Sequence, residues 1–348
     1  MTRGEAAVRI DGTPLPGDPL RIGVLGAARI AADAIVGPAH ALGHRLVAIA
    51  ARDRDRAEAF ATEHGVERIH GDYQAVIDDP EVDVIYNPLV NSLHAQWNLA
   101  AVRAGKPVLT EKPFAANADS ARAVADAATA AGVVVLEGYH YRFHPLVARA
   151  EQLLAAGAIG DLRRIDVRMS MPTPPDEDPR WSAALAGGAL MDLGCYAAHV
   201  MRTFGAFAGG RPTVRGAVAV LRSPGVDSAC DVDFGFPGRD GAMPVTGHAH
   251  VSMVGDRYDF ALVFRGDGGS IAIPDFLGPH RDDRFIVTGA DGSETVEHLD
   301  RTSTYTHQLA AFADAVRTGA ALPIDVEDSV STMELVDSAY RAAGLTPR

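Results

Sequence analysis

The stretch RIGVLGAARIA, Arg21–Ala31, decides the fold prediction for this chain. An apolar run of strand length is followed directly by a glycine turn and by a helical pattern over Ile30–His40. Gly26 is the first glycine of a G-x-G-x-x-G fingerprint, and Ala28 and Ala31 stand where the other two glycines would be. Alanine is small enough to let a pyrophosphate approach the helix N-terminus. The stretch therefore predicts a dinucleotide-binding turn, with a glycine turn without ligand as the alternative.

Beyond this turn, short apolar runs alternate with helical patterns as far as residue 138. The runs lie at 45–51, 82–86, 107–110 and 133–138, and the helical patterns at 54–64, 93–104 and 117–131. This alternation is typical of a parallel sheet covered on both faces, with right-handed crossovers. Ligands of such sheets lie beyond the carboxyl ends of the strands. Gly26, Asn87, Lys112 and Gly138 fall at these ends.

The pattern changes in the second half of the chain. A helix from Pro145 to Ala155 precedes strand-like runs bounded by Gly, Pro and Asp. The runs lie at 162–171, 213–222, 229–236, 246–256, 258–265, 269–273 and 284–288, and helices are predicted at 305–318 and 326–343. Short strands joined by tight turns favour an antiparallel sheet that is open on one face. A partner subunit is the usual cover for such a face.

These patterns predict an α/β protein with two domains, as a length of 348 residues also does. We expect a flexible tail over 1–20, a Rossmann dinucleotide-binding domain over 21–145, and an α/β domain with a mostly antiparallel open sheet over 146–348. We assign substrate binding and oligomerisation to the last of these.

Composition excludes several classes of protein. The net charge of −13 argues against a nucleic-acid surface and against docking on anionic lipid. Met1–Leu20 lacks the apolar core of a signal peptide, and no uninterrupted apolar segment approaches the roughly 20 residues that span a bilayer. Cys195 and Cys230 form no disulfide or metal framework, which fits a reducing cytoplasm. We therefore predict a cytoplasmic enzyme.

The residues after the second predicted strand bear on the cofactor. An acidic residue there would bind the ribose hydroxyls of NAD, whereas an arginine would bind the 2′-phosphate of NADP. Arg52 comes first, and its guanidinium can bind a phosphate through two N–H groups and stack on adenine. Asp53 comes one residue later, in a position to cap the following helix. The order favours NADP(H) over NAD(H), with a solvated charge cluster as the alternative.

Two stretches supply candidate catalytic residues. EKP, 111–113, follows a predicted strand, and GGALMDLGCY, 187–196, places Asp192 four residues before Tyr196, on one face of a helix. A phenol has a pKa of about 10 and needs a nearby positive charge to move a proton near neutrality. We therefore predict Tyr196 as the acid/base of a hydride transfer, assisted by Lys112, with Asp192 binding substrate or orienting Lys112. The alternatives are a lysine that reaches solvent and an Asp/Tyr pair on a helix surface.

Four motifs in register resemble the glucose–fructose oxidoreductase/inositol dehydrogenase (Gfo/Idh/MocA) family. They are GVLGAARIA at 23–31, EKP at 111–113, EGYHYRFHP at 137–145 and GGALMDLGCY at 187–196. The resemblance runs from about Arg21 to the last helix and implies a Rossmann domain, a second domain with a large mostly antiparallel sheet, and a homodimer or homotetramer. Many members carry histidine where this chain has Tyr196. Tyrosine there, with AARD at 50–53, resembles the dihydrodiol dehydrogenase, xylose dehydrogenase and sugar ketoreductase branch, which commonly uses NADP.

The motifs and strand ends together give the expected site. The expected cofactor-binding residues are Gly26, Ala28, Arg29, Ile30, Arg52, Asn87, Pro88, Asn91, His94, Glu111 and Lys112. The expected substrate-binding residues are Tyr139, Arg142, Arg180, Trp181, Asp192, Tyr196 and His199. For His199 a packing role is the stronger alternative. We expect no metal, because His248 and His250 share a strand face without an apparent third ligand, and no covalent step that would need Cys195.

The sequence therefore predicts an NADP-dependent dehydrogenase or ketoreductase acting on a sugar or related cyclic polyol. Two alternatives remain open. One is a trans-dihydrodiol dehydrogenase, and the other is a regulatory protein that binds NADP without turnover.

Overall fold

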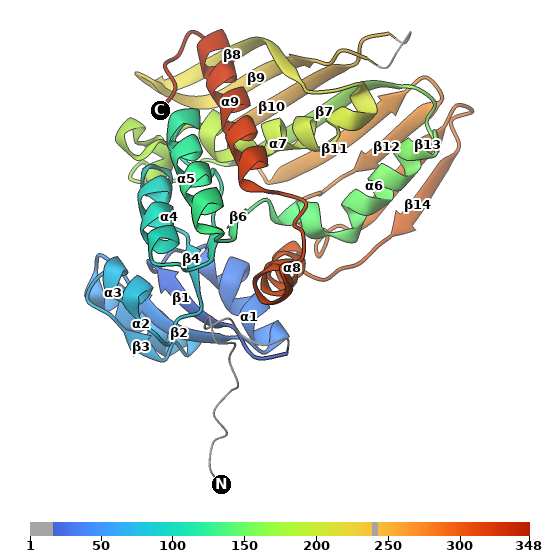
Figure 1. Cartoon of the computed structure of the whole chain (residues 1–348). Coiled ribbons are helices and arrows are strands. Elements are labelled where there is room, and N and C mark those ends of the chain that lie inside the picture. Colours follow the sequence, from blue (N-terminus) through green and yellow to red (C-terminus); the bar gives the residue numbers. More distant parts are fainter. Residues whose placement is uncertain (1–16, 239–242) are drawn as a thin grey trace. The chain divides into compact units, whose positions relative to one another are not determined.

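A computed structural model describes residues 17–238 and 243–348, and Figure 1 shows its helices and strands. Most of the tail expected at 1–20 lies outside the described residues. The chain forms two compact units. Unit 1 contains the residues up to Phe114 with Asp119–Gly138 and Tyr305–Ser329, and unit 2 contains Ala115–Ala118, Tyr139–Thr304 and Val330–Arg348. The domain limits expected from the sequence stay a prediction.

Unit 1 is built on a six-stranded parallel sheet, which confirms the predicted Rossmann architecture. Its strands are β1 (Arg21–Leu25), β2 (Arg45–Ala50), β3 (Arg68–Ile69), β4 (Val84–Asn87), β5 (Val108–Thr110) and β6 (Val135–Glu137). The strand order is β3-β2-β1-β4-β5-β6. The chain reverses its direction of travel across the sheet between β1 and β4. Ligands of doubly wound sheets bind at this switch point, beyond the carboxyl ends of the strands.

The helices of unit 1 fill most of the predicted positions. They are η1 (Ala32–Val36), α1 (Gly37–Leu42), α2 (Arg54–His64), α3 (Tyr73–Asp78), η2 (Asn91–Leu93), α4 (His94–Arg103), α5 (Ala118–Ala131) and α8 (Thr304–Thr318). The single helix predicted over 30–40 is instead a π-helical turn, η1, followed by α1. Pro38 explains the difference, because proline has no N–H to donate and its ring clashes with the preceding helical turn.

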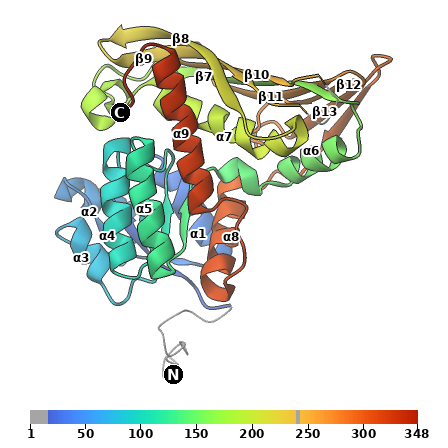
Figure 2. The same ribbon diagram turned by 45° about the horizontal axis from the view of Figure 1, so that its top comes forward.

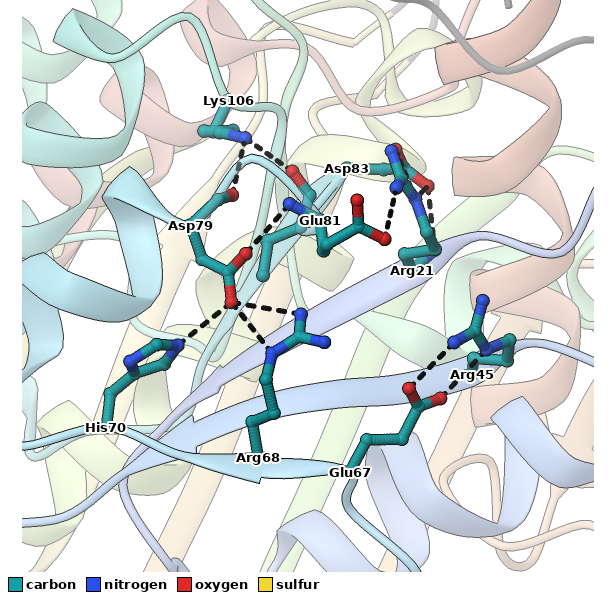
Figure 3. A network of polar contacts seen from close by, with 10 residues as sticks. Arg21, Arg45, Glu67, Arg68, His70, Asp79, Glu81, Asp83 and Lys106 are labelled. Atoms are coloured by element: carbon teal, nitrogen blue, oxygen red, sulfur yellow. Dashed lines mark hydrogen bonds and ion pairs between the residues drawn. The ribbon is translucent and has the colours of Figure 1, made fainter. Parts of the chain in front are cut away.

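Charged side chains join the strands of unit 1 where the strands begin (Figure 3). The Asp79 carboxylate accepts hydrogen bonds from Arg68 Nη2 at 3.0 Å, from His70 Nε2 at 2.9 Å and from the Glu81 backbone N–H at 2.8 Å. The Lys106 ammonium donates to the carbonyl oxygens of Asp79 and Val82. This cluster closes the loop between α3 and β4.

Two further ion pairs lie along the same edge. Arg21, the first residue of β1, binds Asp83 just before β4, with Nη2 2.7 Å from Oδ1. Arg45, the first residue of β2, binds Glu67 just before β3, with Nη2 2.7 Å from Oε2. Each pair ties neighbouring strands together at the amino-terminal edge of the sheet (Figure 3).

Unit 2 is built on an eight-stranded sheet in which every neighbouring pair is antiparallel except β7 and β10. Its order is β14-β13-β12-β11-β7-β10-β9-β8. The strands are β7 (Leu162–Pro172), β8 (Thr213–Ser223), β9 (Val226–Gly235), β10 (Thr246–Gly255), β11 (Asp259–Gly266), β12 (Gly269–Ile273), β13 (Arg284–Gly289) and β14 (Glu294–His298). The predicted mostly antiparallel sheet is confirmed.

The helices of unit 2 are mostly short. They are η3 (His140–Phe143), α6 (Pro145–Ala155), η4 (Pro179–Trp181), η5 (Ala183–Leu185), η6 (Leu190–Gly194), α7 (Cys195–Thr203), η7 (Gly205–Ala208) and α9 (Val326–Ala342). Figure 2 shows α6 and α7 along one face of the sheet. The segment Ala183–Thr203 is long and apolar enough to cross a membrane by composition, but 89% of its most apolar window is buried. Burial of this degree is typical of a core segment.

The other face of this sheet carries alternating charges. In β7, Ile165, Val167 and Met169 are buried, whereas Arg164 and Arg168 are exposed. His248 and His250 lie on the outer face, where their Nδ1 atoms are each 2.9 Å from a carboxylate oxygen, of Asp233 and Asp231 respectively. The two histidines therefore form cross-strand pairs with aspartates.

Candidate active site

The turn after β1 has the conformation that a dinucleotide fingerprint requires. Gly26 has a φ of +93°, its N–H donates to the Ala50 carbonyl at 2.7 Å, and a Cβ there would lie 3.0 Å from Leu89 Cδ2. Glycine tolerates this left-handed backbone and the close approach, and other residues do not. Ala28 is half-buried, and Arg29 and Ile30 are exposed at the start of the helical segment. The backbone between β1 and η1 is thus accessible at its helix N-terminus.

An exposed arginine, Arg52, follows the end of β2. Asp53 accepts a hydrogen bond from the Arg56 N–H at 3.2 Å and caps α2, as its position in the sequence predicts. Arg52 is exposed, and across residues 17–238 and 243–348 it makes no hydrogen bond or ion pair. Its guanidinium can therefore bind an anion beyond the carboxyl ends of β1 and β2 without breaking an existing contact.

His94 holds the backbone beside Lys112. Its Nδ1 lies 2.7 Å from the Pro113 carbonyl oxygen and its Nε2 lies 2.7 Å from that of Leu89. The peptide bond between Lys112 and Pro113 is cis. Burial lowers the pKa of His94, and the charge of Lys112 lowers it further, against the two carbonyl oxygens that raise it. His94 therefore joins the loop after β4 to the turn that carries Lys112.

Two carboxylates support the same turn from the other side. Glu137, the last residue of β6, is fully buried and accepts a hydrogen bond from the Phe114 N–H at 2.7 Å. Glu111 accepts a hydrogen bond from the Tyr86 hydroxyl at 3.0 Å, and its own N–H donates to the Asn87 carbonyl at 2.9 Å. The backbone on both sides of Lys112 is therefore fixed by buried polar groups from β4 and β6. The half-buried Lys112 side chain extends from this support.

The Asn87 side chain is occupied within the protein. Its amide donates to Asn98 Oδ1 at 2.8 Å and to the His94 carbonyl at 3.3 Å, and its Oδ1 accepts from the Leu89 N–H at 3.3 Å. These bonds shape the loop that begins with the buried Pro88 and leads to Asn91, the half-buried first residue of η2. Asn87 thus shapes the loop at the switch-point edge of the sheet.

In unit 2, Tyr196 lies in the first turn of a helix that starts irregularly. The π-helical turn η6 contains Asp192 and runs directly into α7, which begins at Cys195. A Cβ at Gly194 would lie 2.6 Å from Leu190 Cδ1, so this turn requires glycine. Tyr196 and Asp192 are both buried, with 4% and 7% of their surface exposed. The alternative prediction, in which Asp192 and Tyr196 lie on an exposed helix surface, is therefore wrong.

Three aromatic side chains from one segment surround the Tyr196 ring. The ring centroids of Tyr139, His140 and Tyr141 lie 5.4, 5.9 and 6.3 Å from that of Tyr196. Only Tyr139 was among the residues predicted from the sequence. His140 and Tyr141 belong to the same EGYHYRFHP motif, and its density of aromatic residues is the signal that would have included them.

His199 packs against the same segment. Its ring stacks on Tyr139, with centroids 3.9 Å apart and planes at 14°, and its Nδ1 lies 2.7 Å from the Tyr141 hydroxyl. The ring is almost fully buried. Both contacts hold the segment that contains Tyr139 and Tyr141 against α7. They agree with the alternative prediction that His199 has a packing role.

The structure brings Asp192 and Arg180 together. Arg180 Nε donates to Asp192 Oδ2 at 2.8 Å, and Arg180 Nη1 lies 3.3 Å from Asp178 Oδ1. The charge of Asp192 raises the pKa of the Arg180 guanidinium still further above its usual value. The two predicted substrate residues thus form one polar pair beside the helix that carries Tyr196.

The remaining predicted residues have other neighbours in unit 2. The Trp181 indole N–H donates to the Pro174 carbonyl at 3.2 Å, and the Arg222 guanidinium lies 4.3 Å from the ring centroid. Arg142 forms an ion pair with Glu151 of α6 at 3.0 Å. The Cys195 thiol is buried and donates to the Asp192 carbonyl at 3.7 Å, so it packs within the helix.

Comparison with known families gives two matches. The model of an oxidoreductase family with an NAD-binding Rossmann fold, GFO_IDH_MocA, matches residues 20–139. The GFO/IDH/MocA C-terminal domain matches residues 147–272. The two matches together cover most of the chain, in the same order as the two sheets.

Individual proteins match over nearly the whole chain. D-xylose 1-dehydrogenase (NADP(+)) 2 from Haloferax volcanii is 35% identical over 93% of this chain and 97% of its own length. Trans-1,2-dihydrobenzene-1,2-diol dehydrogenase from Xenopus laevis is 30% identical over 91% of this chain and 93% of its own length.

Solved structures give the same fold. A 3-ketoreductase from Actinomadura kijaniata, in complex with NADP and TDP-benzene, matches with a TM-score of 0.83 and 30% identity, over 93% of this chain and 98% of that one. Structures of two variants of that enzyme, one with tyrosine replaced by phenylalanine and one with lysine replaced by alanine, match with TM-scores of 0.82 and 0.80.

Proposed function

The chain belongs to the Gfo/Idh/MocA family of oxidoreductases, and we propose that it transfers a hydride between NADP(H) and a sugar or related cyclic polyol. The reacting group is a secondary alcohol in one direction and a ketone in the other. The observation that carries this proposal is the pair of motifs EKP and GGALMDLGCY. Buried polar side chains bind the backbone next to Lys112 of the first motif, and aromatic side chains surround the ring of Tyr196 in the second.

The preference for NADP(H) rests on Arg52. Its exposed guanidinium makes no other contact in the described part of the chain, and it stands beyond β2, where a 2′-phosphate would lie. The positive-φ turn at Gly26 and the accessible helix N-terminus after it fit a pyrophosphate. The names of the xylose dehydrogenase and the 3-ketoreductase structure include NADP, which agrees with this reading. NAD(H) is the alternative cofactor, and without a 2′-phosphate it lacks the charge-assisted contact with Arg52.

When bound, the nicotinamide supplies the hydride acceptor or donor, and the protein supplies the proton transfer. In the proposed mechanism the Tyr196 phenolate accepts the hydroxyl proton as the alcohol is oxidised, and the phenol returns it in the reverse direction. The Lys112 ammonium stabilises the phenolate, because a neighbouring positive charge lowers the pKa of a phenol. We assign Asp192 and Arg180 to hydrogen bonding of the substrate hydroxyls, since both side chains are polar and Asp192 lies four residues before Tyr196 in the same helical segment.

The roles of Lys112 and Tyr196 have independent support from the Actinomadura ketoreductase. The lysine and the tyrosine replaced in its two variants are separated in sequence by the same number of residues as Lys112 and Tyr196 are here. The trans-dihydrodiol dehydrogenase from Xenopus laevis, at 30% identity, favours a second candidate function, oxidation of a trans-dihydrodiol. The same acid/base would serve both substrates, because each presents a secondary alcohol.

The test is turnover over a panel of aldoses, cyclic polyols, keto sugars and trans-dihydrodiols, followed by the absorbance of the reduced nicotinamide. Tyr196→Phe should lower turnover about 10²–10⁴-fold with little change in NADPH affinity, because it removes only the phenolic oxygen. Near-normal turnover of this variant would exclude Tyr196 as the acid/base. Tight NADPH binding without turnover of any substrate would instead favour a regulatory protein.

For the outer face of the unit 2 sheet, the proposed partner is a second copy of this chain. Its exposed side chains alternate in sign and pair within the sheet, as Arg265 does with Asp166 at 2.9 Å and Arg168 with Asp259 at 2.6 Å. A face of alternating charge is self-complementary, as a two-fold interface must be. Sedimentation should show a dimer or tetramer, and a monomer at micromolar concentration would contradict this.

A further inference from the structure

A buried carboxylate from β9 caps the helical segment that carries Asp192 and Tyr196. Asp227 has no exposed surface, and its Oδ2 accepts a hydrogen bond from the Leu190 N–H, the first residue of η6, at 2.6 Å. The N-terminal residue Ala189 offers no capping side chain. A carboxylate at a helix N-terminus accepts hydrogen bonds from the N–H groups that have no partner within the helix. Its negative charge also interacts favourably with the positive end of the helix dipole. This cap comes from a strand far away in sequence.

The glycine pair before the helix makes room for this contact. Gly188 has a φ of +122°, and a Cβ there would overlap Asp227 Oδ1 and lie 2.8 Å from Arg348 Nη2. A Cβ at Gly187 would overlap the Arg180 carbonyl. Gly188 is therefore required for the turn to approach Asp227 and Arg348, and Gly187 for it to pass the Arg180 backbone.

Arg348 supplies the counter-charge to Asp227. Its Nη2 lies 3.5 Å from Asp227 Oδ1, its Nη1 donates to the Gly225 carbonyl at 2.5 Å, and its guanidinium lies 4.9 Å from the Tyr340 ring centroid. Only 7% of the side chain is exposed. Its carbonyl oxygen accepts a hydrogen bond from Asn117 Nδ2 at 2.5 Å. The arginine is thus buried and held at both its backbone and its guanidinium.

The charge of Arg348 favours the ionised form of the cap. Burial raises the pKa of Asp227 above its usual value, and the Leu190 N–H, the Asp227 N–H and the charge of Arg348 limit this rise. A buried carboxylate that loses its cationic partner tends to take up a proton, and a protonated carboxyl is a weaker acceptor. Loss of Arg348 would therefore weaken the bond to Leu190 at the start of the helical segment.

We infer that Arg348, acting through Asp227, is a positioning residue that fixes the helical start at Leu190 and so the place of Tyr196 along α7. The inference rests on the proposed function of Tyr196 as the acid/base. Its consequence is that Arg348 sets the rate of the chemical step without touching cofactor. A displacement of about 1 Å at a reacting group can cost up to 10²-fold in rate.

The test compares Arg348→Met with Arg348→Lys, Asp227→Asn and the control Arg341→Met. Arg341 lies on α9, seven residues before Arg348, and its side chain is 63% exposed and 3.8 Å from Asp337, so its loss leaves the cap intact. Arg348→Met should lower kcat about 10–100-fold with KM for NADPH within about twofold. Arg348→Lys should restore most of kcat. Asp227→Asn should resemble Arg348→Met, because an uncharged amide has a single acceptor oxygen and cannot serve both the Leu190 N–H and the guanidinium.

Amide hydrogen exchange over 187–194 gives a readout that needs no activity. In Arg348→Met it should accelerate at least about tenfold in this segment alone, because opening the cap frees the Leu190 N–H. Unchanged exchange there, or kcat equal to that of Arg341→Met, would overturn the inference. Faster exchange throughout unit 2 with an unchanged kcat would also overturn it, since Arg348 would then be a general stabilising residue. If the unmodified protein turns over no substrate, the proposed function fails, while exchange still decides whether Arg348 holds the turn.

Discussion

The two edges of the parallel sheet in unit 1 use their charges in opposite ways. At the amino-terminal edge, Arg21, Arg45 and Arg68 are all bound to carboxylates within 3.0 Å (Figure 3). At the carboxyl-terminal edge, Arg52 is exposed and makes no such contact with the residues that the structure describes. Buried polar groups there, such as His94 and Glu137, bind backbone atoms and shape the loops.

This difference separates residues that stabilise the fold from residues that are available to a ligand. A cation already paired in the folded protein must break that pair before it can bind a phosphate. A cation without a partner gains the whole interaction. The comparison therefore predicts that substitutions at one edge change activity or cofactor choice, and that substitutions at the other change stability.

The largest effect is expected at Lys112, on the carboxyl-terminal edge. Lys112→Met removes the ammonium but keeps most of the aliphatic chain. We expect kcat/KM to fall at least about 10²–10⁴-fold, because the proposed mechanism requires this charge to stabilise the phenolate and to bind the cofactor. The melting temperature should hardly change, since the supports from His94 and Glu137 bind backbone atoms.

The double variant Lys112→Met/Tyr196→Phe sharpens this test. If both residues act on one proton, the double variant should be scarcely worse than the poorer single variant. Fully additive losses would show that the two residues do not share a step. A large loss of stability in Lys112→Met would contradict the comparison of the two edges.

The next largest effect concerns the choice of cofactor. Arg52→Ala should remove most of the preference for NADPH over NADH, a loss of about 1.5–3 kcal/mol for one charge-assisted contact. Dissociation constants for both cofactors measure it by titration. Arg54→Ala is the matched control, because Arg54 is exposed nearby but pairs with Glu58 along α2. Equal affinity of the unmodified protein for NADPH and NADH would contradict the role of Arg52.

At the amino-terminal edge, Asp79→Asn should reduce stability. The substitution removes the charge that accepts bonds from Arg68 and His70, and we expect a loss of about 1–3 kcal/mol in the free energy of unfolding. Chemical denaturation measures this, and kcat of the folded enzyme should stay within about twofold. A fall in kcat without a loss of stability would reverse the expected roles of the edges.

The same variant should change the response to acid. Although burial opposes it, hydrogen bonds from His70, the Glu81 N–H and Arg68 hold the pKa of Asp79 below its usual value. A depressed carboxyl pKa contributes stability above the unfolded-state pKa of about 3.9, and this contribution is lost as pH falls through the folded-state pKa. Asp79→Asn should therefore lose less stability than the unmodified protein on acidification below about pH 4.

The smallest effect is expected for Arg45 and Glu67. Their side chains are 49% and 36% exposed, and exposed ion pairs contribute only about 0.2–1 kcal/mol. Arg45→Ala should shift the midpoint of denaturation slightly, and added salt should reduce the shift. A loss as large as that of Asp79→Asn would show that the whole edge acts as one network.

The sequence predicts those strands and helices whose own residues, or residues next to them, form a recognisable pattern. The strands of unit 1 are short apolar runs, and the Asp53 cap lies beside the helix that it caps. By contrast, β3 has only two residues, Arg68 and Ile69, and β14 is an exposed strand, ETVEH, without an apolar face. Neither differs from a loop in composition, and only pairing with a neighbouring strand makes it a strand.

The candidate site shows the same division. Lys112, Tyr196 and Arg52 stand in motifs or at strand ends, so local pattern identifies them. The partners that hold the site come from distant parts of the chain, such as Glu137 for the Phe114 N–H and Asp227 for the Leu190 N–H. No periodicity or spacing in the sequence predicts such contacts, because tertiary folding alone brings these groups together.

The π-helical turn at Leu190–Gly194 has a consequence for insertions and deletions. A π-helical turn holds one residue more than the α-helical turn it replaces. Deleting a single residue within 190–194 would let the segment close as a regular α-helix, with the flanking residues in nearly their present relative orientation. A single deletion within α7 itself would instead rotate the residues on its two sides by about 100° relative to each other. The π-helical turn is therefore the place where this helical segment absorbs a change of one residue in length.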